Sequence, residues 1–349
     1  MKKKLIILTP GFPKDEEDST CLPHIQQLIV SFIKLYSAQS INIITFQYPY
    51  NSNSYYWHGV KINCIGGKNK SKLHRLLTWI KAYRIIKKIQ LNYNVIGVFS
   101  VFHTECALVG SIFCRRNNIK HISWLQGQDA KIDNPYVKRI KAKSSELAAL
   151  SDFLQQEFEK NHNVKPEHII NNGITENDYP LFNSKNRNID ILGVGSLIPL
   201  KNYTLFIEII MKIKESYPRI KTAIAGDGVE KELLQKLIND NDLQENIELL
   251  GLISHTEVLK LMSDSKILLH TSNYEGSCSV IFEALYSGCH VASTCNPSNL
   301  IFNEFFHSTD NQKLQIQIEK WLLENTLNQN RILFNTIDNS AKKIMDLYL

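Results

Sequence analysis

The sequence is short of features that would anchor it in a membrane or hold it together covalently. Its longest apolar run, at residues 95–102, is far below the roughly 18 residues that a membrane-spanning helix requires. The 7 cysteines form no Cys-x2-Cys pair and have no histidine at zinc-binding spacing, which argues against a disulfide-stapled scaffold and a zinc finger. Only four apolar residues precede Thr9, too few for the core of a signal peptide. We therefore expect a cytoplasmic protein.

Length and composition exclude a small scaffold and a disordered chain. At roughly 150 residues per domain, 349 residues predict about two domains, and 43% hydrophobic with 21% charged residues is ordinary for a globular protein. Charge is uneven: residues 1–180 hold 24 Lys and Arg against 14 Asp and Glu, a net +10, whereas residues 181–349 hold 16 against 20, a net −4. A basic half can attract phosphate, anionic lipid or nucleic acid, and charge alone does not choose among them.

Short apolar runs alternate with longer amphipathic stretches along the whole chain. This alternation predicts an α/β fold in which parallel strands are covered by helices on both faces. Residues 180–187 lack periodicity and lie where the charge balance changes sign, so we place a boundary there. The prediction is a doubly wound, Rossmann-like domain at 1–182, a second at 183–330, and a C-terminal helix at 331–349 that packs back on the first. Strands are expected at 5–9, 41–46, 60–65, 95–100, 121–125, 147–150, 168–171, 190–194, 220–225, 246–250, 267–270 and 290–293.

Two glycine-containing turns in the second half follow predicted strands. The first runs from Gly193 to Lys201 and enters a helix, where backbone amides and a lysine can meet a phosphate group. It lacks the third glycine of a dinucleotide-binding fingerprint. The second turn is Gly226-Asp-Gly228. Each motif alone also fits an ordinary strand-to-helix turn with Lys201 in solvent, so both interpretations stay open at this point.

The most informative segment is residues 270–288. A strand ends, a loop of small residues carries Glu275, and a helix follows that contains Glu283 and closes at Gly288. A helix N-terminus offers amide groups and partial positive charge to a diphosphate, and carboxylates accept hydrogen bonds from sugar hydroxyls. Glu283 interrupts an otherwise apolar stretch, so its carboxylate needs a partner. Upstream, Ser254-x-x-Glu257 predicts a helix-capping box.

These motifs give the sequence a resemblance to GT-B glycosyltransferases of the family 4 type. The shared features are the Glu-x7-Glu signature at Glu275 and Glu283, the GxGSLxxxKN turn at residues 193–202, the GDG turn at 226–228 and LLGLIS at 249–254. The first half is similar in scattered places, among them TPGFP at residues 9–13 and FSVFH at residues 99–103. The resemblance implies a GT-B fold, with two Rossmann-like domains facing across a cleft.

The resemblance also implies roles for individual residues. Lys201 would bind the donor diphosphate, Glu283 the ribose hydroxyls, and Glu275 the hexose near the reacting carbon. His103 would contact the transferred sugar from the other domain, so the implied catalytic residues are His103, Lys201 and Glu275. The implied donor-binding set is Gly195, Ser196, Lys201, Gly226, Glu275, Gly276, Ser277, Cys278 and Glu283.

Several positions depart from the family pattern. Ser196 stands where the family usually has an arginine, which leaves Lys201 as the evident cation of its turn. Residues 18–21 replace a glycine pair in the first loop, and residues 126–129 read Gln-Gly-Gln-Asp where the family often has His-Gly-x-Asp. We therefore expect a donor site that is nearly complete but altered.

No metal and no cofactor are expected. Asp240-Asn-Asp242 has the Asp-x-Asp form that metal-dependent glycosyltransferases of another fold use, but it ends a predicted helix rather than a strand. Lys201 and a helix terminus can bind a diphosphate without a divalent ion. The nucleotide-diphosphate sugar, UDP- or GDP-linked, is the substrate.

Residues 68–88 hold eight Lys and Arg and no acidic residue. Leucines share one helical face that Arg84 then continues, while Trp79 and Ile86 occupy another, so the apolar stripe shifts along the helix. A single membrane-surface helix would keep one stripe. Two interpretations stay open: ordinary surface helices, or attraction to an anionic lipid or lipid-diphosphate acceptor. The absence of an aromatic-basic motif argues against a nucleic-acid partner.

The resemblance implies a retaining hexosyltransferase. It would move a hexose from a nucleotide-diphosphate sugar to an acceptor hydroxyl on a surface polysaccharide or a lipid-linked glycan, with peripheral contact at the inner face of an anionic membrane. Two alternatives use the same architecture. A sugar-nucleotide epimerase would need an acid/base carboxylate pair facing the sugar, which Glu275 alone does not supply. A non-catalytic sugar-nucleotide-binding protein is suggested by Ser196 and the altered first loop.

Overall fold

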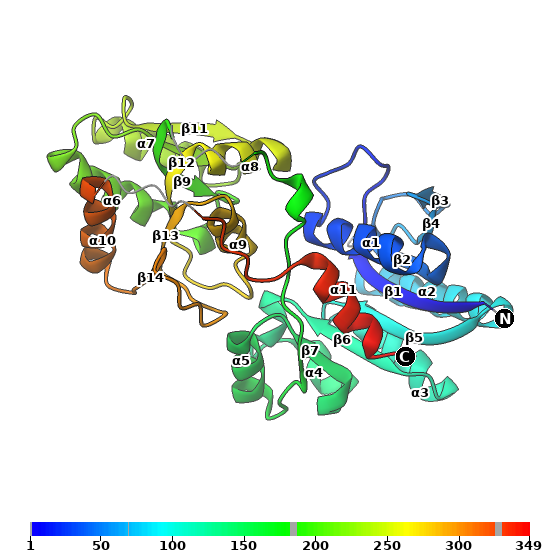
Figure 1. The fold of residues 1–349 in the computed structure, drawn as a ribbon. Coiled ribbons are helices and arrows are strands. Elements are labelled where there is room, and N and C mark those ends of the chain that lie inside the picture. Colours follow the sequence, from blue (N-terminus) through cyan, green and yellow to red (C-terminus); the bar gives the residue numbers. More distant parts are fainter. Residues whose placement is uncertain (1, 69, 182–186, 325–329) are drawn as a thin grey trace. The chain divides into compact units, whose positions relative to one another are not determined.

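The computed structural model describes residues 2–68, 70–181, 187–324 and 330–349. The chain divides into two compact units (Figure 1): unit 1 comprises Met1–Gly173 with Ile337–Leu349, and unit 2 comprises Ile174–Thr336. Each unit contains one mainly parallel sheet with helices packed against it. The predicted α/β class with two Rossmann-like domains is therefore confirmed.

Unit 1 is built on an eight-stranded sheet in the order β3-β4-β2-β1-β5-β6-β7-β8. All neighbouring strands pair in parallel except β3, which is antiparallel to β4. Strand order reverses between β1 and β5, as in a doubly wound sheet. The elements are β1 (Lys3–Gly11), α1 (Pro23–Tyr36), β2 (Ile41–Tyr48), β3 (Ser54–Trp57), β4 (Val60–Cys64), α2 (Lys72–Asn92), β5 (Asn94–Val101), α3 (Glu105–Asn117), β6 (His121–Leu125), α4 (Pro135–Ile140), β7 (Leu147–Ala149), α5 (Asp152–His162), β8 (His168–Ile169) and α11 (Ile337–Asp346).

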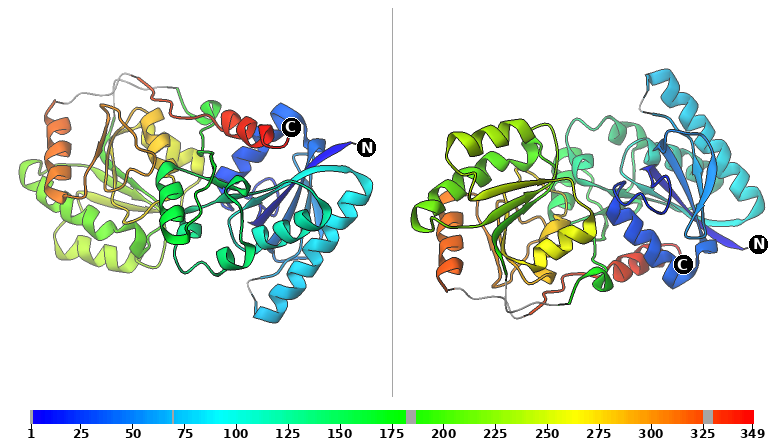
Figure 2. Two further views of the ribbon diagram at one scale, coloured as in Figure 1. Left: turned by 90° about the horizontal axis from the view of Figure 1, so that it is seen from below. Right: turned by 90° about the horizontal axis from the view of Figure 1, so that it is seen from above.

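Alternate residues of the central strand β1 enter two separate cores. Leu5 and Ile7 pack with α1, α5 and α11, whereas Ile6 and Leu8 pack with α2 and α3 on the other face. A strand that is buried on both faces requires a continuous apolar sequence, which explains the run of four apolar residues in β1. Helix α2 lies along the outside of this unit (Figure 2).

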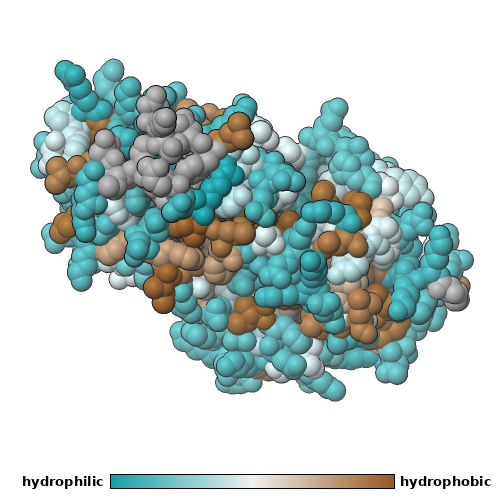
Figure 3. Space-filling model, viewed as in Figure 1, coloured by the Kyte–Doolittle hydropathy of each residue, from teal (hydrophilic) through white to brown (hydrophobic). Residues whose placement is uncertain are grey.

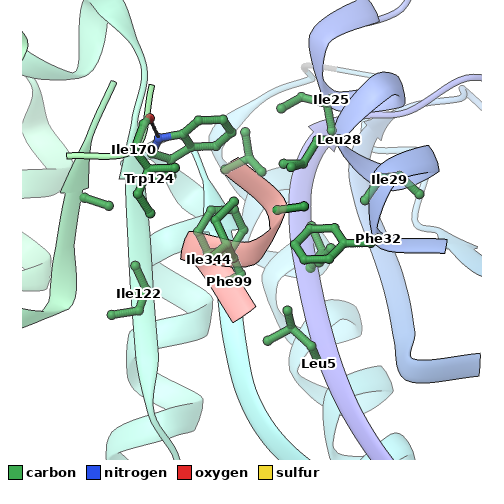
Figure 4. Close-up of a cluster of buried hydrophobic side chains, with 14 of the residues drawn as sticks. Leu5, Ile25, Leu28, Ile29, Phe32, Phe99, Ile122, Trp124, Ile170 and Ile344 are labelled. Carbon is green, nitrogen blue, oxygen red and sulfur yellow. Dashed lines mark hydrogen bonds between the residues drawn. The ribbon is translucent and has the colours of Figure 1, made fainter. Parts of the chain in front are cut away.

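The C-terminal helix α11 belongs to unit 1 and packs on α1. Figure 4 shows Ile344 of α11 among the side chains of α1 and the central strands, next to Phe99 and Phe32. At the rim, Asp338 accepts hydrogen bonds from Ser31 Oγ at 2.7 Å and from Lys34 Nζ at 2.6 Å. The last residues of the chain thus complete the core of the first unit.

Unit 2 is built on a six-stranded sheet in the order β11-β10-β9-β12-β13-β14, and each neighbouring pair is parallel. Ile191 and Leu192 of β9 enter different cores, so this sheet is also covered on both faces. The elements are β9 (Ile189–Val194), α6 (Tyr203–Ser216), β10 (Thr222–Ala225), α7 (Lys231–Asp240), β11 (Ile247–Gly251), α8 (His255–Ser263), β12 (Ser265–His270), α9 (Ser279–Tyr286), β13 (His290–Ser293), β14 (Phe305–His307) and α10 (Asn311–Glu324).

Two strands and the unit boundary differ from the sequence predictions. Strands β3 and β14 were not predicted, because both are short edge strands that carry little periodicity over 4 and 3 residues. The predicted boundary at 182/183 lies outside the described residues, and the contacts divide the chain at 173/174 and 336/337 instead. Residues 174–180 pack with unit 2, because Ile174 and Tyr179 join its apolar core.

On the face shown in Figure 3, hydrophobic residues form separate patches among hydrophilic ones. Within the described ranges, none of the helices combines the length and the apolar character that crossing a membrane requires.

The packing of α11 predicts a large stability loss when Ile344 is shortened. Ile344 is fully buried, so Ile344→Ala should destabilise unit 1 by about 2–5 kcal/mol through lost apolar contact and a residual cavity. Denaturant unfolding followed by tryptophan fluorescence measures the change. Lys343→Ala, at the exposed neighbouring position, is the matched control and should leave the midpoint nearly unchanged. Equal midpoints for both variants would contradict this account of α11.

Candidate functional site

The strand order of unit 2 brings two predicted motifs together. Strand β9 has β10 on one side and β12 on the other, so the direction of sheet growth reverses between β9 and β12. Ligands of open α/β sheets bind at the carboxyl ends of strands at such a switch point. The turn that contains Lys201 follows β9, and the loop that contains Glu275 follows β12.

The two glycine turns pack backbone against backbone. A Cβ atom on Gly226 would lie 1.9 Å from the carbonyl oxygen of Gly195, and one on Gly228 would lie 2.4 Å from that of Leu197. Leu197 N donates to Asp227 O at 3.0 Å, which ties the turns together. Gly226 therefore has a structural reason to be glycine that is separate from its predicted contact with a donor.

The loop after β12 fixes the backbone around Lys201. Thr271 Oγ1 donates to the Lys201 carbonyl at 2.9 Å, and Asn273 N donates to the Leu200 carbonyl at 2.9 Å. Asn202 follows in the left-handed conformation, with φ 51°, and α6 begins at Tyr203. The Lys201 side chain is only 21% exposed and pairs with Glu275, so the interpretation that left it in solvent is wrong.

Lys201 and Glu275 form a mostly buried ion pair. Lys201 Nζ donates to Glu275 Oε1, and the two side chains are 21% and 15% exposed. His270 Nε2 lies 3.4 Å from the same oxygen. Burial opposes ionisation of Glu275, but the hydrogen bond from His270 and the charge of Lys201 outweigh it and lower the pKa of Glu275 to about 2. Glu275 is therefore a carboxylate at neutral pH.

The orientation of His270 is set by the neighbouring strand β13. Ser293 Oγ donates its one proton to Cys295 O at 2.7 Å, so toward His270 Nδ1, 2.9 Å away, it can only accept. His270 therefore carries a proton on Nδ1, and its Nε2 faces Glu275 and Ser272 Oγ, the latter at 3.0 Å. This assignment follows from the hydrogen-bond pattern.

The partner that Glu283 requires is His255. His255 begins α8, directly after the Ser254 N-cap, and its Nε2 lies 2.9 Å from Glu283 Oε1. The predicted capping box is confirmed: Ser254 Oγ accepts from Glu257 N, and Glu257 accepts from Ser254 N. Sequence reasoning assigned no role to His255; the buried position of Glu283 was the only signal that a partner existed.

Residues 276–278 connect Glu275 to α9. Ser277 and Cys278 are 5% exposed, and Cys278 is the N-cap in the left-handed conformation with φ 54°. Helix α9 begins at Ser279, directly after this left-handed residue. Cys278 makes no capping hydrogen bond with its side chain. The helix dipole places partial positive charge beside Glu275 and Lys201.

His103 lies at the corresponding place in unit 1, after β5. It is fully buried, its backbone N donates to Asp129 Oδ2 at 2.8 Å, and its Nδ1 lies 2.9 Å from Ser123 Oγ. Its Nε2 has no hydrogen-bond partner among the described residues, and His103 is one of the residues that line a hollow of about 410 Å³. Burial and nearby His162 lower the pKa of His103 to about 3, so its ring is neutral at pH 7. Contact with a transferred sugar stays a prediction.

Comparison with known proteins identifies the domain. Residues 176–332 match the family described as Glycosyl transferases group 1. The whole fold aligns with Anabaena Alr3699/HepE in complex with UDP and glucose, with TM-score 0.72, 15% identity and 98% of each chain covered. The chain has the GT-B fold, and most of its second unit matches the group 1 glycosyltransferase family. The finer family 4 subtype stays a prediction.

Two curated relatives of this glycosyltransferase match parts of it. One is the phosphatidylinositol N-acetylglucosaminyltransferase gpi3 subunit of Schizosaccharomyces pombe, 32% identical over 106 residues, which are 30% of this chain and 23% of the relative. The other is the Campylobacter jejuni N-acetylgalactosamine-N,N'-diacetylbacillosaminyl-diphospho-undecaprenol 4-alpha-N-acetylgalactosaminyltransferase, 31% identical over 140 residues, covering 38% of this chain and 37% of the relative. The chain thus spans well under half the length of these relatives.

The pair of His255 and Glu283 predicts a titration that can be measured. The hydrogen bond with Glu283 raises the pKa of His255 above the ordinary 6.5. The stabilisation by this pair should be complete below the unfolded pKa and be lost as pH rises through the higher folded pKa. Histidine NMR titration should show that Glu283→Gln lowers the pKa of His255 and leaves those of the other histidines unchanged. An unaltered His255 titration would rule out the pairing.

Proposed function

We propose that the chain transfers a hexose or N-acetylhexosamine, with retention of configuration, from a UDP-linked donor to a hydroxyl group of a lipid-linked glycan acceptor. The observation that carries the proposal is the mostly buried pair of Lys201 and Glu275 at the β9/β12 switch point, next to the start of α9. UDP as the donor nucleotide is supported by the aligned Anabaena protein, whose structure holds UDP and glucose.

The site offers each part of a sugar nucleotide a partner. The Lys201 ammonium and the N-terminus of α9 would stabilise the diphosphate, first in the bound donor and then as the leaving group. A diphosphate beside Lys201 competes with Glu275 for the ammonium, which frees the Glu275 carboxylate for hexose hydroxyls. Glu283, deeper in α9 and oriented by His255, would accept hydrogen bonds from the ribose.

The proposed reaction exchanges one glycosidic bond for another. The bond between the anomeric carbon and the β-phosphate oxygen breaks, and a bond from that carbon to the acceptor oxygen forms. The acceptor proton leaves with the released UDP or to solvent. His103, with a neutral ring, keeps its predicted role toward the transferred sugar.

The activities named for the two relatives support a lipid-linked acceptor. One name gives phosphatidylinositol and the other a diphospho-undecaprenol glycan, and both describe transferases of N-acetylhexosamines. An acceptor of this kind is presented at a membrane surface, so an enzyme that uses it needs affinity for that surface.

Helix α2 is the surface that we assign to this contact. Its buried face, Thr78, Ala82, Ile86 and Ile89, packs on unit 1, and a second apolar set faces solvent: Leu73, Leu76, Leu77 and Ile80, which are 77%, 50%, 56% and 40% exposed. Exposed Arg75, Lys81, Arg84, Lys87 and Lys88 flank this set. The shift of the apolar stripe in the sequence therefore reflects two separate apolar faces of α2, one packed in the core and one exposed to solvent. Exposed leucines among basic residues suit an anionic lipid surface.

Donor binding should depend on Lys201 and Glu283. Loss of a hydrogen bond to a charged group removes about 1.5–3 kcal/mol, so Lys201→Ala and Glu283→Ala should each weaken UDP binding by roughly 10- to 100-fold in calorimetry. Lys266→Ala is the matched control, because Lys266 is also ion-paired, with Asp190 at 2.9 Å, but lies at the amino end of β12. Unchanged affinity in both site variants would overturn the assignment.

Transfer should require an acceptor. UDP release from UDP-GlcNAc, UDP-GalNAc or UDP-glucose should rise when a polyprenyl-diphosphate-linked amino sugar or phosphatidylinositol is added, and NMR of the product should show the donor's anomeric configuration. Acceptor-independent conversion of the sugar would indicate an epimerase, and binding without turnover would indicate a binding protein.

Membrane binding should depend on the exposed leucines of α2. Because each half-exposed leucine that enters lipid contributes about 1 kcal/mol or more, the double variant Leu76→Ser with Leu77→Ser should bind phosphatidylglycerol-containing vesicles at least about 10-fold more weakly. Raised salt should also weaken binding of the unaltered chain. The control pair Leu233→Ser with Leu252→Ser alters leucines that are 49% and 72% exposed in unit 2. Equal vesicle binding by both double variants would contradict the role of α2.

A further inference from the structure

We infer that the same pocket is a binding site for a thiophilic divalent cation of the Zn²⁺ class, held by His270, Glu275 and Cys278. The inference goes beyond the proposed function, because none of the donor chemistry requires such an ion. Its consequence for donor binding rests on the proposed function, but the metal site itself does not.

The three side chains converge from the end of β12 and the start of α9. One ligand atom of each residue, an imidazole nitrogen, a carboxylate oxygen and the thiol sulfur, lies within 4.8 Å of the other two. His270 Nε2 and Glu275 Oε1 are 3.4 Å apart. Zinc bonds of about 2.0–2.3 Å at tetrahedral angles place ligand atoms about 3.5 Å from one another, so His270 and Glu275 already have this separation and Cys278 would move closer when the ion binds.

The ligand types fit a borderline-soft cation. A set of one imidazole, one carboxylate and one thiolate favours Zn²⁺ over Mg²⁺ or Ca²⁺, which take oxygen ligands. Three protein ligands leave a fourth coordination position for water or for a substrate oxygen. When the ion binds, the Cys278 thiol releases its proton to solvent and its sulfur becomes the ligand.

The surroundings orient the histidine for coordination. Because Ser293 Oγ accepts from Nδ1–H at 2.9 Å, the neutral form of His270, which is the form that binds a metal, has its lone pair on Nε2, the atom that faces Glu275. A second hydrogen bond that fixes the tautomer of a histidine is the usual support of a metal-bound imidazole.

Lys201 is the competitor for this position. Its ammonium pairs with the same Glu275 oxygen that would bind the ion, so a bound dication displaces Lys201 from Glu275 by charge and by space. Since Lys201 and Glu275 are the residues proposed to bind the donor, the metal would inhibit by altering both. The site therefore gives this glycosyltransferase a route to inhibition by zinc.

Cobalt binding to the full chain tests the site directly. In a non-chelating reducing buffer, Co²⁺ should bind at one ion per chain with a thiolate-to-cobalt charge-transfer band in the near ultraviolet, and Zn²⁺ should displace it. Cys278→Ser should abolish the band, and Ser293→Ala, which removes the hydroxyl group that orients His270, should weaken binding by about 10-fold or more. Cys21→Ser is the matched control, since Cys21 is a partly exposed thiol in unit 1.

Three outcomes would overturn the inference: no charge-transfer band in the unaltered chain, an unchanged band in Cys278→Ser, or loss of the band in Cys21→Ser. Circular dichroism of each variant establishes that it is folded, and Cys278→Ala provides a second test of the same sulfur. Zn²⁺ should also raise the Kd for UDP in the unaltered chain but not in Cys278→Ser. If cobalt binds as expected and UDP does not bind at all, the proposed function fails while the metal site stands.

Discussion

The carboxyl ends of β9 and β12 must lie side by side, because the chain builds the sheet of unit 2 outward in opposite directions from these two strands. The proposals for this unit depend on that constraint. Thr271 and Asn273, in the loop after β12, donate hydrogen bonds to the turn after β9. The backbones on both sides of the switch point are therefore linked by hydrogen bonds. The glycine turns extend this contact to β10, where there is no space for a side chain between Gly226 and Gly195. A rigid backbone of this kind positions side chains more accurately than a loop on the surface does.

The ion pair of Lys201 and Glu275 is poorly explained as a source of stability. Both side chains have lost most of their hydration, and a pair of apolar residues commonly stabilises such a position as well or better. The same holds for the pair of His255 at the start of α8 and Glu283, which lies in a stretch of α9 whose other residues face an apolar core. The charged groups instead provide preorganised contacts. An ammonium for phosphate oxygens and two carboxylates for hydroxyls are already oriented before a ligand binds. A divalent cation carries more charge than the Lys201 ammonium, so it can compete with Lys201 for the carboxylate of Glu275.

Much of this arrangement could be read from the sequence, since parallel strands buried on both faces appear as apolar runs, and helices between them as periodic ones. Twelve predicted strands correspond to strands of the structure, whereas β3 and β14 are too short for a pattern to emerge. The turns around Lys201 and Glu275 were recognisable because they need glycine, small residues and charge in a fixed order. His255 was not, because its partner lies 28 positions away and only the fold brings α8 next to α9. The unit boundary was misplaced for a similar reason: Ile174 and Tyr179 belong to unit 2 through packing, which composition does not reveal.

The uneven charge of the chain has a physical interpretation once the two units are compared. The overall charge of unit 2 is negative. At the carboxyl ends of its strands, however, charged side chains form individual ion pairs. In unit 1 the groups at the equivalent edge are buried, with His103 neutral and the pKa of Asp129 raised to about 7 by burial despite hydrogen bonds from Gln126 and His103. Part of the positive charge of unit 1 lies along α2 and around a hollow of about 920 Å³ at the amino ends of its strands, lined by Lys2, Lys4, Lys61 and Lys88. Lysines spread over a surface act through a long-range field rather than through one fixed contact. Such a field suits an extended anionic partner, and a membrane that presents a lipid-linked acceptor is a partner of that kind.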